Sequence, residues 1–378
     1  MTPPTARALH PGAWWLWAIG LAVAVSQTTN PLVLLLAAAA VTLVVVARRT
    51  DSPWGRAFRL YAVLGGFIIG LRLVLHVLVG LKYGEFVVLP LPTIGLPGWA
   101  AGIDLLGDVR LEGLLGALFE GLRLAVMILC IGAANALADP KRLLAALPGA
   151  LQEIGTAIVV AISVAPQLAE SARRVHRARL LRGDAARGLR AFRRVAMPVL
   201  EDTLERSLSL AASMDSRGYG RRGAVSPARH RTTGLLTLGG LLCTAVGSYG
   251  VLDATSPEWV GTPMLLVGVA LGALGLRSGS LAVSRTTYRP SPWRTPETLT
   301  AACGVLAAVA ALASVRWEPA ALTMPLAPLG PPQLPWLLTL GLLVATLPAA
   351  LTPPPPVHRT RAARATGTAT TTTGRSHA

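Results

Sequence analysis

Eight runs of mainly apolar residues recur along the chain, and they restrict its fold more than any other feature. They cover residues 13–29, 31–47, 60–81, 113–137, 234–250, 262–275, 298–315 and 334–351. A helix that crosses a bilayer needs roughly 20 apolar residues, and it pairs every backbone polar group internally. With 52% hydrophobic and 14% charged residues, the chain is too apolar for an ordinary soluble domain. We therefore expect an all-α polytopic protein of the lipid bilayer with about eight transmembrane helices.

Arginines set the expected orientation of these helices. Arg48, Arg49, Arg56 and Arg59 crowd the link between the second and third runs. Because cytoplasmic loops are enriched in Lys and Arg, we place this link and both termini in the cytoplasm. The loop of residues 82–112 then lies outside, which agrees with its four acidic against two basic residues.

A basic block follows the fourth run. Residues 171–231 hold fifteen arginines against five acidic residues, within a chain of net charge +17. The apolar stretch 152–168 resembles a further span, but a span there would place the whole block outside, against the positive-inside rule. We therefore expect this section to form helices that lie against the membrane face or against a partner.

The section is interpreted as three helices. Asp139-Pro140 is typical of a helix start. A second helix is predicted over residues 151–182, bent near Pro166, and a third from near Pro198, with Leu204 and Leu208 on one apolar face.

Two of these helices are expected to end at matching Arg-Gly pairs, Arg182-Gly183 and Arg217-Gly218. Glycine takes the left-handed conformation that stops a helix. The preceding arginine then projects a rigid fork of donors that suits a carboxylate in a partner's groove. Ordinary helix-capping arginines near anionic lipid are the simpler alternative for a single pair. Two copies on successive helices favour a binding function.

The residues around both pairs resemble the two coupling motifs of the T component of energy-coupling factor (ECF) transporters. They read Ala-Arg-Leu-Leu-Arg-Gly over 178–183 and Ala-Ala-Ser-Met-Asp-Ser-Arg-Gly-Tyr-Gly over 211–220. Asn30-Pro31, the start at Asp139-Pro140 and Arg-Thr-Thr-Tyr-Arg-Pro over 285–290 extend the resemblance to roughly residues 10–315. The first motif departs from the family pattern, because Leu181 stands where a small residue is usual.

The resemblance implies a non-catalytic scaffold without cofactor or metal site, in a bacterial cell membrane. It implies that the chain joins two ABC-type ATPase subunits to a substrate-binding integral membrane (S) subunit that imports a vitamin or a transition-metal ion. The ATPase-coupling residues are then Arg182, Gly183, Arg217 and Gly218. Contacts with the S subunit then involve Leu143, Leu147, Leu204 and Leu208.

The expected organisation has five parts. They are an N-terminal membrane part of four spans (1–137), the coupling helices (138–232), an extra two-span insert (233–284), a C-terminal membrane part of two spans (285–351) and a disordered tail (352–378). The insert has no counterpart in the family pattern.

Other function classes fit less well. A self-contained secondary transporter needs polar groups at mid-membrane, for which Arg72, His76 and Arg123 are the candidates. A lipid-modifying enzyme would need a carboxylate pair, a His/Asp cluster or a metal motif, and the sequence has none. No Walker A motif occurs, so any use of ATP depends on a partner. Nucleic acid is not expected as a partner, because the basic residues lie where topology alone would place them.

Overall fold

The computed structural model describes residues 7–49, 58–79, 84–95, 104–146, 149–182, 189–218, 227–253, 255–257, 259–281, 292–326 and 328–354. The chain forms two compact units. The first combines Met1–Leu143 with Ser291–Ala378, and the second is Leu144–Pro290.

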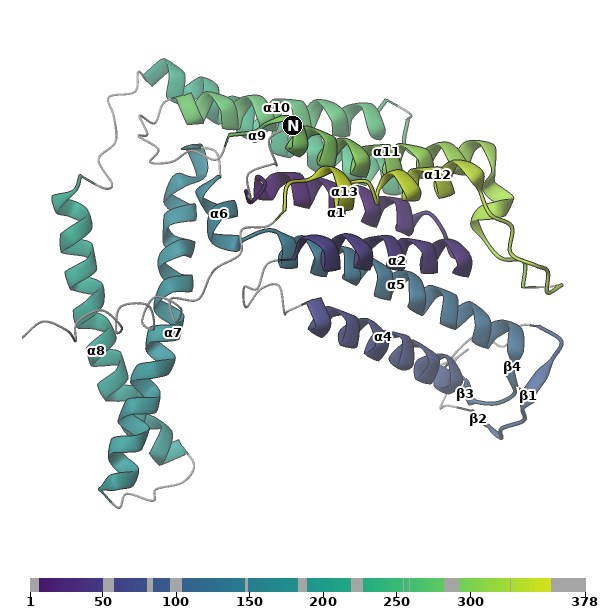
Figure 1. Ribbon diagram of the computed structural model, residues 1–378, viewed down its shortest axis with the longest axis horizontal. Coiled ribbons are helices and arrows are strands. Elements are labelled where there is room, and N and C mark those ends of the chain that lie inside the picture. The colour runs from purple at the N-terminus through teal and green to yellow at the C-terminus, as the bar shows by residue number, and fades with distance from the viewer. Residues whose placement is uncertain are drawn as a thin grey trace, which may run out of the picture. The chain divides into compact units, whose positions relative to one another are not determined.

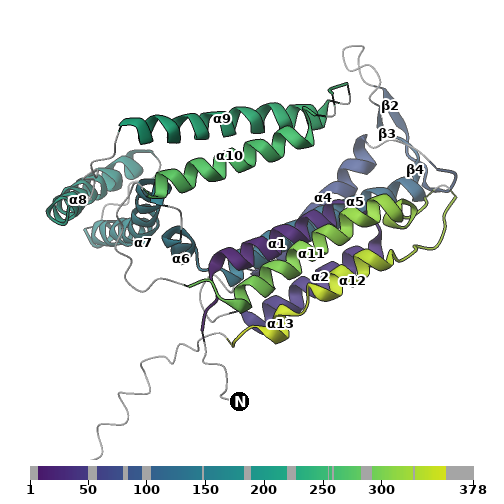
Figure 2. The same cartoon turned by 90° about the horizontal axis from the view of Figure 1, so that it is seen from above.

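The first unit is a helical bundle (Figures 1 and 2). Its elements are α1 (Pro11–Ser26), α2 (Pro31–Arg48), α4 (Phe58–Val79), α5 (Leu111–Leu137), α11 (Thr295–Trp317), η3 (Pro319–Leu322), α12 (Trp336–Val344) and α13 (Pro348–Leu351). Helix α1 packs between α5 and α11, α2 packs on α5 and α12, and α4 packs on α5. Segments from both ends of the sequence therefore share one bundle.

The N-terminal helices begin at recognisable caps. His10 Nδ1 accepts a hydrogen bond from the Gly12 backbone N–H at 3.1 Å, one residue after the start of α1 at Pro11. Asn30 caps α2 in the same way through the Leu32 N–H at 3.1 Å. The Asn30 amide also donates to the carbonyl of Ala321 at 2.9 Å. The cap of α2 thus anchors the C-terminal part of the unit as well.

The core of this unit depends on a close approach of α1 and α11. A Cβ atom at Gly20 would lie 2.2 Å from the carbonyl oxygen of Gly304, so neither helix tolerates a side chain here. The fully buried Trp17 donates its indole N–H to the Ala345 carbonyl at 2.9 Å. Residues after the predicted insert therefore complete the core of the first helices.

A small β structure, which the sequence did not predict, lies between α4 and α5. Strand β1 (Val87–Leu89) pairs with β4 (Val109–Arg110), and β2 (Thr93–Gly95) pairs with β3 (Asp104–Leu106), both antiparallel. The buried Glu112 carboxylate accepts from the backbone N–H groups of Glu85 at 3.0 Å and Phe86 at 3.2 Å. These hydrogen bonds join the residues before β1 to the start of α5.

The second unit holds η2 (Gly149–Leu151), α7 (Gln152–Leu181), α8 (Leu189–Ser216), α9 (Pro227–Leu252) and α10 (Thr262–Leu281). Helices α9 and α10 form a hairpin along the predicted insert (Figure 2). Small residues let their backbones touch, since a Cβ at Gly268 would lie 2.4 Å from the Thr244 nitrogen.

Within the part of the chain that the structure describes, seven helices are long and apolar enough to cross a membrane: α2, α4, α5, α7, α9, α10 and α11. The expectation of a polytopic all-α membrane protein is confirmed. Helix α1 and the stretch Trp336–Leu351 are shorter apolar helices. By length and composition α7 could also span, so its expected place outside the bilayer stays a prediction.

Two expected boundaries were wrong. Helix α8 begins at Leu189, not near Pro198, because the helix-favouring residues before this proline outweigh the lost backbone bond and the ring clash that an interior proline brings, about 3 kcal/mol. The run 334–351 is not one helix, since α12 ends at Val344 and Pro348 opens α13 after a turn. The five-part division of the chain is not tested by these contacts and stays a prediction.

Candidate coupling site

The chain turns from α5 into the candidate site at α6 (Pro140–Ala145). Asp139 Oδ1 accepts from the Lys141 N–H at 2.9 Å, and its carbonyl accepts from Leu143 N–H at 2.9 Å, so the predicted helix start is confirmed. The Leu143 side chain is half-buried. Leu147 lies outside the described residues.

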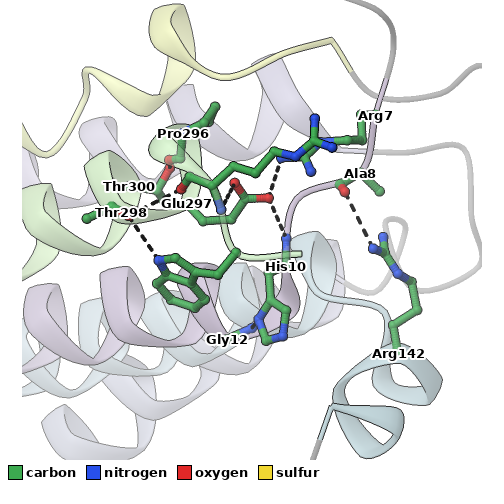
Figure 3. A network of polar contacts seen from close by, with 11 residues as sticks. Arg7, Ala8, His10, Gly12, Arg142, Pro296, Glu297, Thr298 and Thr300 are labelled. Atoms are coloured by element: carbon green, nitrogen blue, oxygen red, sulfur yellow. Dashed lines mark hydrogen bonds and ion pairs between the residues drawn. The ribbon is translucent and has the colours of Figure 1, made fainter. Parts of the chain in front are cut away.

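A buried polar network surrounds the start of α11 in the same unit (Figure 3). The fully buried Glu297 carboxylate pairs with Arg7 at 2.5 Å and accepts from the backbone N–H of His10 at 3.3 Å and of Arg294 at 3.1 Å. Nearby, Arg142 of α6 donates to the Ala8 carbonyl at 3.4 Å. The N-terminal segment thus joins α6 and α11. This network could not be predicted from local sequence, because its partners lie far apart along the chain.

Helices α7 and α8 contact each other (Figure 1), and a second polar cluster joins them. Ser171 Oγ, on α7, donates to Asp202 Oδ2 of α8 at 2.8 Å. Arg206 donates to Asp202 Oδ1 at 2.9 Å, and Arg174 lies 3.9 Å from Oδ2. The hydrogen bonds from Ser171 and Arg206 hold the pKa of the Asp202 carboxyl below its usual range. The cluster was not predicted.

Both predicted arginine tips lie at helix ends with exposed side chains. Arg182 directly follows the last residue of α7, and its backbone N–H bonds to the Arg179 carbonyl at 3.0 Å. Arg217 directly follows α8, and its N–H bonds to Met214 at 3.1 Å. Gly218 has φ +77°, which confirms the predicted left-handed stop. Gly183 lies outside the described residues.

The two tips are set at opposite ends of α8. Arg182 ends the helix that leads into α8, whereas Arg217 follows the last residue of α8. A helix of 28 residues is about 42 Å long at 1.5 Å per residue. The tips are therefore suited to two separate binding sites.

The predicted leucine face of α8 points away from α7. Leu204 and Leu208 are 63% and 64% exposed. Asp202, which faces α7, precedes Leu204 by two residues, and two residues turn a helix by roughly 200°. An apolar stripe is thereby presented on the side opposite to the crossing.

The polar residues considered for a self-contained transporter lie on α4 and α5. Arg72 of α4 forms an ion pair with Glu120 of α5, and both side chains are nearly half exposed. His76 follows Arg72 by one helical turn and is half-buried, as is Arg123. The partner Glu120 was missed, although it is a single acid within an apolar run.

These features define a multi-pass helical membrane protein that presents two crossed amphipathic helices with exposed arginine ends. The model of the cobalt transport protein family CbiQ matches residues 5–227, which is more than half of the chain. The protein therefore belongs to this family, that of the EcfT/CbiQ-like components of ECF transporters. The match ends at the first residue of α9, before most of the hairpin and before α11. A comparison with curated proteins gives no match.

Proposed function

We propose that the protein is the transmembrane scaffold of an ECF-type importer, which links two ABC-type ATPase subunits to an S subunit. The observation that carries this proposal is the pair of exposed tips at Arg182 and Arg217, held at opposite ends of α8 inside the family-matched region. Each guanidinium would bind a carboxylate of one ATPase. Gly183 and Gly218 would shape the two tips.

The exposed face of α8 supports contact with the S subunit. Leu204 and Leu208 form an apolar surface on the exposed side of α8, opposite to its contact with α7. Leu143 and Leu147 would extend this contact from α6 and the residues after it. A change transmitted from the ATPases through α7 and α8 would then reach the substrate-binding subunit.

The family indicates transport of cobalt. We propose a transition-metal ion as cargo, with a vitamin as the alternative cargo of such importers. The scaffold itself would be non-catalytic, with ATP hydrolysed by its partners, in the cell membrane of a bacterium with both termini cytoplasmic.

Co-purification from the native membrane tests the proposal. We expect the wild-type chain to retain two ABC-type ATPases, and the double variant Arg182→Ala/Arg217→Ala to insert normally but to lose them together with ATP-driven cobalt uptake. Arg177→Ala/Arg193→Ala is the matched control, since it removes two exposed arginines that lie within the same helices and not at their C-terminal ends. Retention of both ATPases by the tip variant, or their absence from the wild type, contradicts the proposal.

No observation favours the alternative of a self-contained transporter. The charge of Arg72 is balanced by Glu120 across α4 and α5, which gives this pair a role in holding the two helices together.

A further inference from the structure

Among the described residues, the contact between α7 and α8 has no fully buried apolar side chain larger than glycine. Among the side chains described on α8, none is buried, and on α7 only Gly155 and Ser171 are buried. Half-buried apolar side chains flank the contact, with Leu168 and Val175 on α7 and Val195 and Val199 on α8. These contacts are partly open to the surroundings, so the directional hydrogen bonds of the polar cluster around Asp202 add definition to the crossing that apolar contacts alone do not supply.

Asp202 is placed to hold both helices at once. Its two carboxylate oxygens are divided between the helices, because Oδ2 accepts from Ser171 of α7 and Oδ1 accepts from Arg206 of α8. Arg206 lies one turn after Asp202 and fixes the orientation of the carboxylate. Arg174, one turn after Ser171, adds a second positive charge from α7. Ser171 is only 4% exposed.

We propose that Asp202 and Ser171 are positioning residues that lock the crossing of α7 and α8, so that the two arginine tips move as one body. This inference rests on the proposed coupling function. From the crossing, α7 continues for about 11 residues to Arg182 and α8 for about 15 residues to Arg217, which are lever arms of roughly 16 and 22 Å. A fixed crossing transmits a displacement of one tip to the other and to the leucine stripe. A loose crossing lets each tip move alone.

The first test measures the crossing directly in the full-length chain. Ala178 and Ser213 are exposed and lie shortly before the two tips, so spin labels at cysteines placed there report the distance between them. Cys130, Cys243 and Cys303 are first replaced by serine. We expect Asp202→Asn and Ser171→Ala to broaden the distance distribution. Glu201→Gln is the matched control, because it removes one carboxylate charge from the adjacent, exposed position.

The second test measures coupling in the reconstituted complex with both ATPases and the S subunit. We expect Asp202→Asn to keep the ATPases bound, because the tips are unchanged, but to lower the cobalt imported per ATP hydrolysed by roughly fivefold or more, the lower range of typical coupling between sites. The exchange Ser171→Asp/Asp202→Ser places the carboxylate on α7, one turn before Arg174, and the hydroxyl on α8. The hydrogen bond between positions 171 and 202 can then form in the reverse direction, and coupling should recover. A merely structural loss would lower insertion and would not be rescued.

The inference is overturned if Asp202→Asn matches Glu201→Gln in both the label distances and the ratio of uptake to hydrolysis. It is equally overturned if the exchange variant stays uncoupled while its label distances return to those of the wild type. Failure of the proposed function can be told apart from failure of this inference. If the proposed function is wrong, the wild-type chain itself retains no ATPase, and the label distances still test the crossing of α7 and α8.

Discussion

Gly218 ends α8 in a backbone conformation that an L side chain disfavours. Its φ of +77° belongs to the left-handed region, and its N–H bonds back to the Asp215 carbonyl at 2.9 Å. A side chain at this position costs roughly 1–2 kcal/mol. The direction in which Arg217 projects therefore depends on its glycine neighbour.

We expect Gly218→Ala to weaken capture of one ATPase by up to roughly tenfold, although Arg217 is retained. Quantitative co-purification at increasing ATPase concentration measures this effect. Gly234→Ala serves as the control, because Gly234 lies inside α9 with no atom within 4 Å of a Cβ placed there. Equal capture by the two variants would show that the tip tolerates an alanine.

His10 makes the stability of α1 depend on pH. Burial lowers the pKa of its imidazole, Glu297 raises it and Arg142 lowers it, with burial the largest effect. The neutral ring caps α1 through Nδ1, and protonation removes this acceptor. Because the folded pKa lies below the unfolded value, stability is complete above about pH 6.5 and falls as the pH drops below it.

The melting temperature in detergent should fall between pH 7.5 and pH 5.5, by roughly 2 °C or less because the ring is only half-buried and solvent screens its charge. His10→Asn keeps a capping acceptor that does not titrate, so the difference between this variant and the wild type should shrink or vanish above pH 7 and grow at pH 5.5. A wild type and variant that respond alike to pH would contradict this role of the imidazole.

At the scale of elements, the hairpin of α9 and α10 depends on small residues. A Cβ at Gly268 would meet the Thr244 nitrogen at 2.4 Å, whereas one at Gly272 has no atom within 4 Å. We expect Gly268→Val to destabilise the hairpin by about 1–3 kcal/mol and Gly272→Val to leave it intact.

Disulfide formation measures the hairpin contact. The hydroxyls of Thr233 and Ser278 lie 2.8 Å apart, so cysteines at these positions should cross-link. The Gly268→Val change should abolish the cross-link. A cross-link of undiminished yield in that variant would mean that α9 and α10 accommodate the side chain.

Local sequence patterns could predict where helices form, but they could not predict which helices pack against each other. Apolar runs located most long helices, and Asp139-Pro140 located α6. The start of α8 was misplaced because proline favours a first turn and is costly inside a helix, and the packing that tolerates Pro198 inside α8 cannot be predicted from local sequence. The short strands have too little periodicity to be recognised.

The same distinction between local pattern and distant contact applies to the candidate site. The arginine tips follow from their own neighbours in sequence, since an Arg-Gly pair after an amphipathic run specifies a helix end. The bond between Ser171 and Asp202 joins residues 31 positions apart, and no spacing rule connects them. Glu297 and Arg7 are separated by 290 positions. Such contacts appear only when the helices are packed.

For the whole molecule, the orientation in the membrane gives the sharpest prediction. If α7 lies outside the bilayer, the arginine-rich block is cytoplasmic and the loop between α9 and α10 is external. A cysteine at Trp259, which is 68% exposed in that loop, should react with an impermeant reagent in intact cells. A cysteine at Arg193 should react only after permeabilisation. The reverse pattern would show that α7 crosses the membrane.

The hydrogen bond between Trp17 and Ala345 can form only late in biosynthesis. Its two partners are 328 positions apart, so at about 5–20 residues per second the ribosome needs roughly 16 to 66 s to supply the acceptor after the donor. During that time α1 is already made, yet its indole N–H and its glycine contact surface have no final partner. The first helix therefore depends on the insertion machinery or on lipid to shield it until the last helices arrive, and a nascent chain arrested before residue 345 cannot close its bundle.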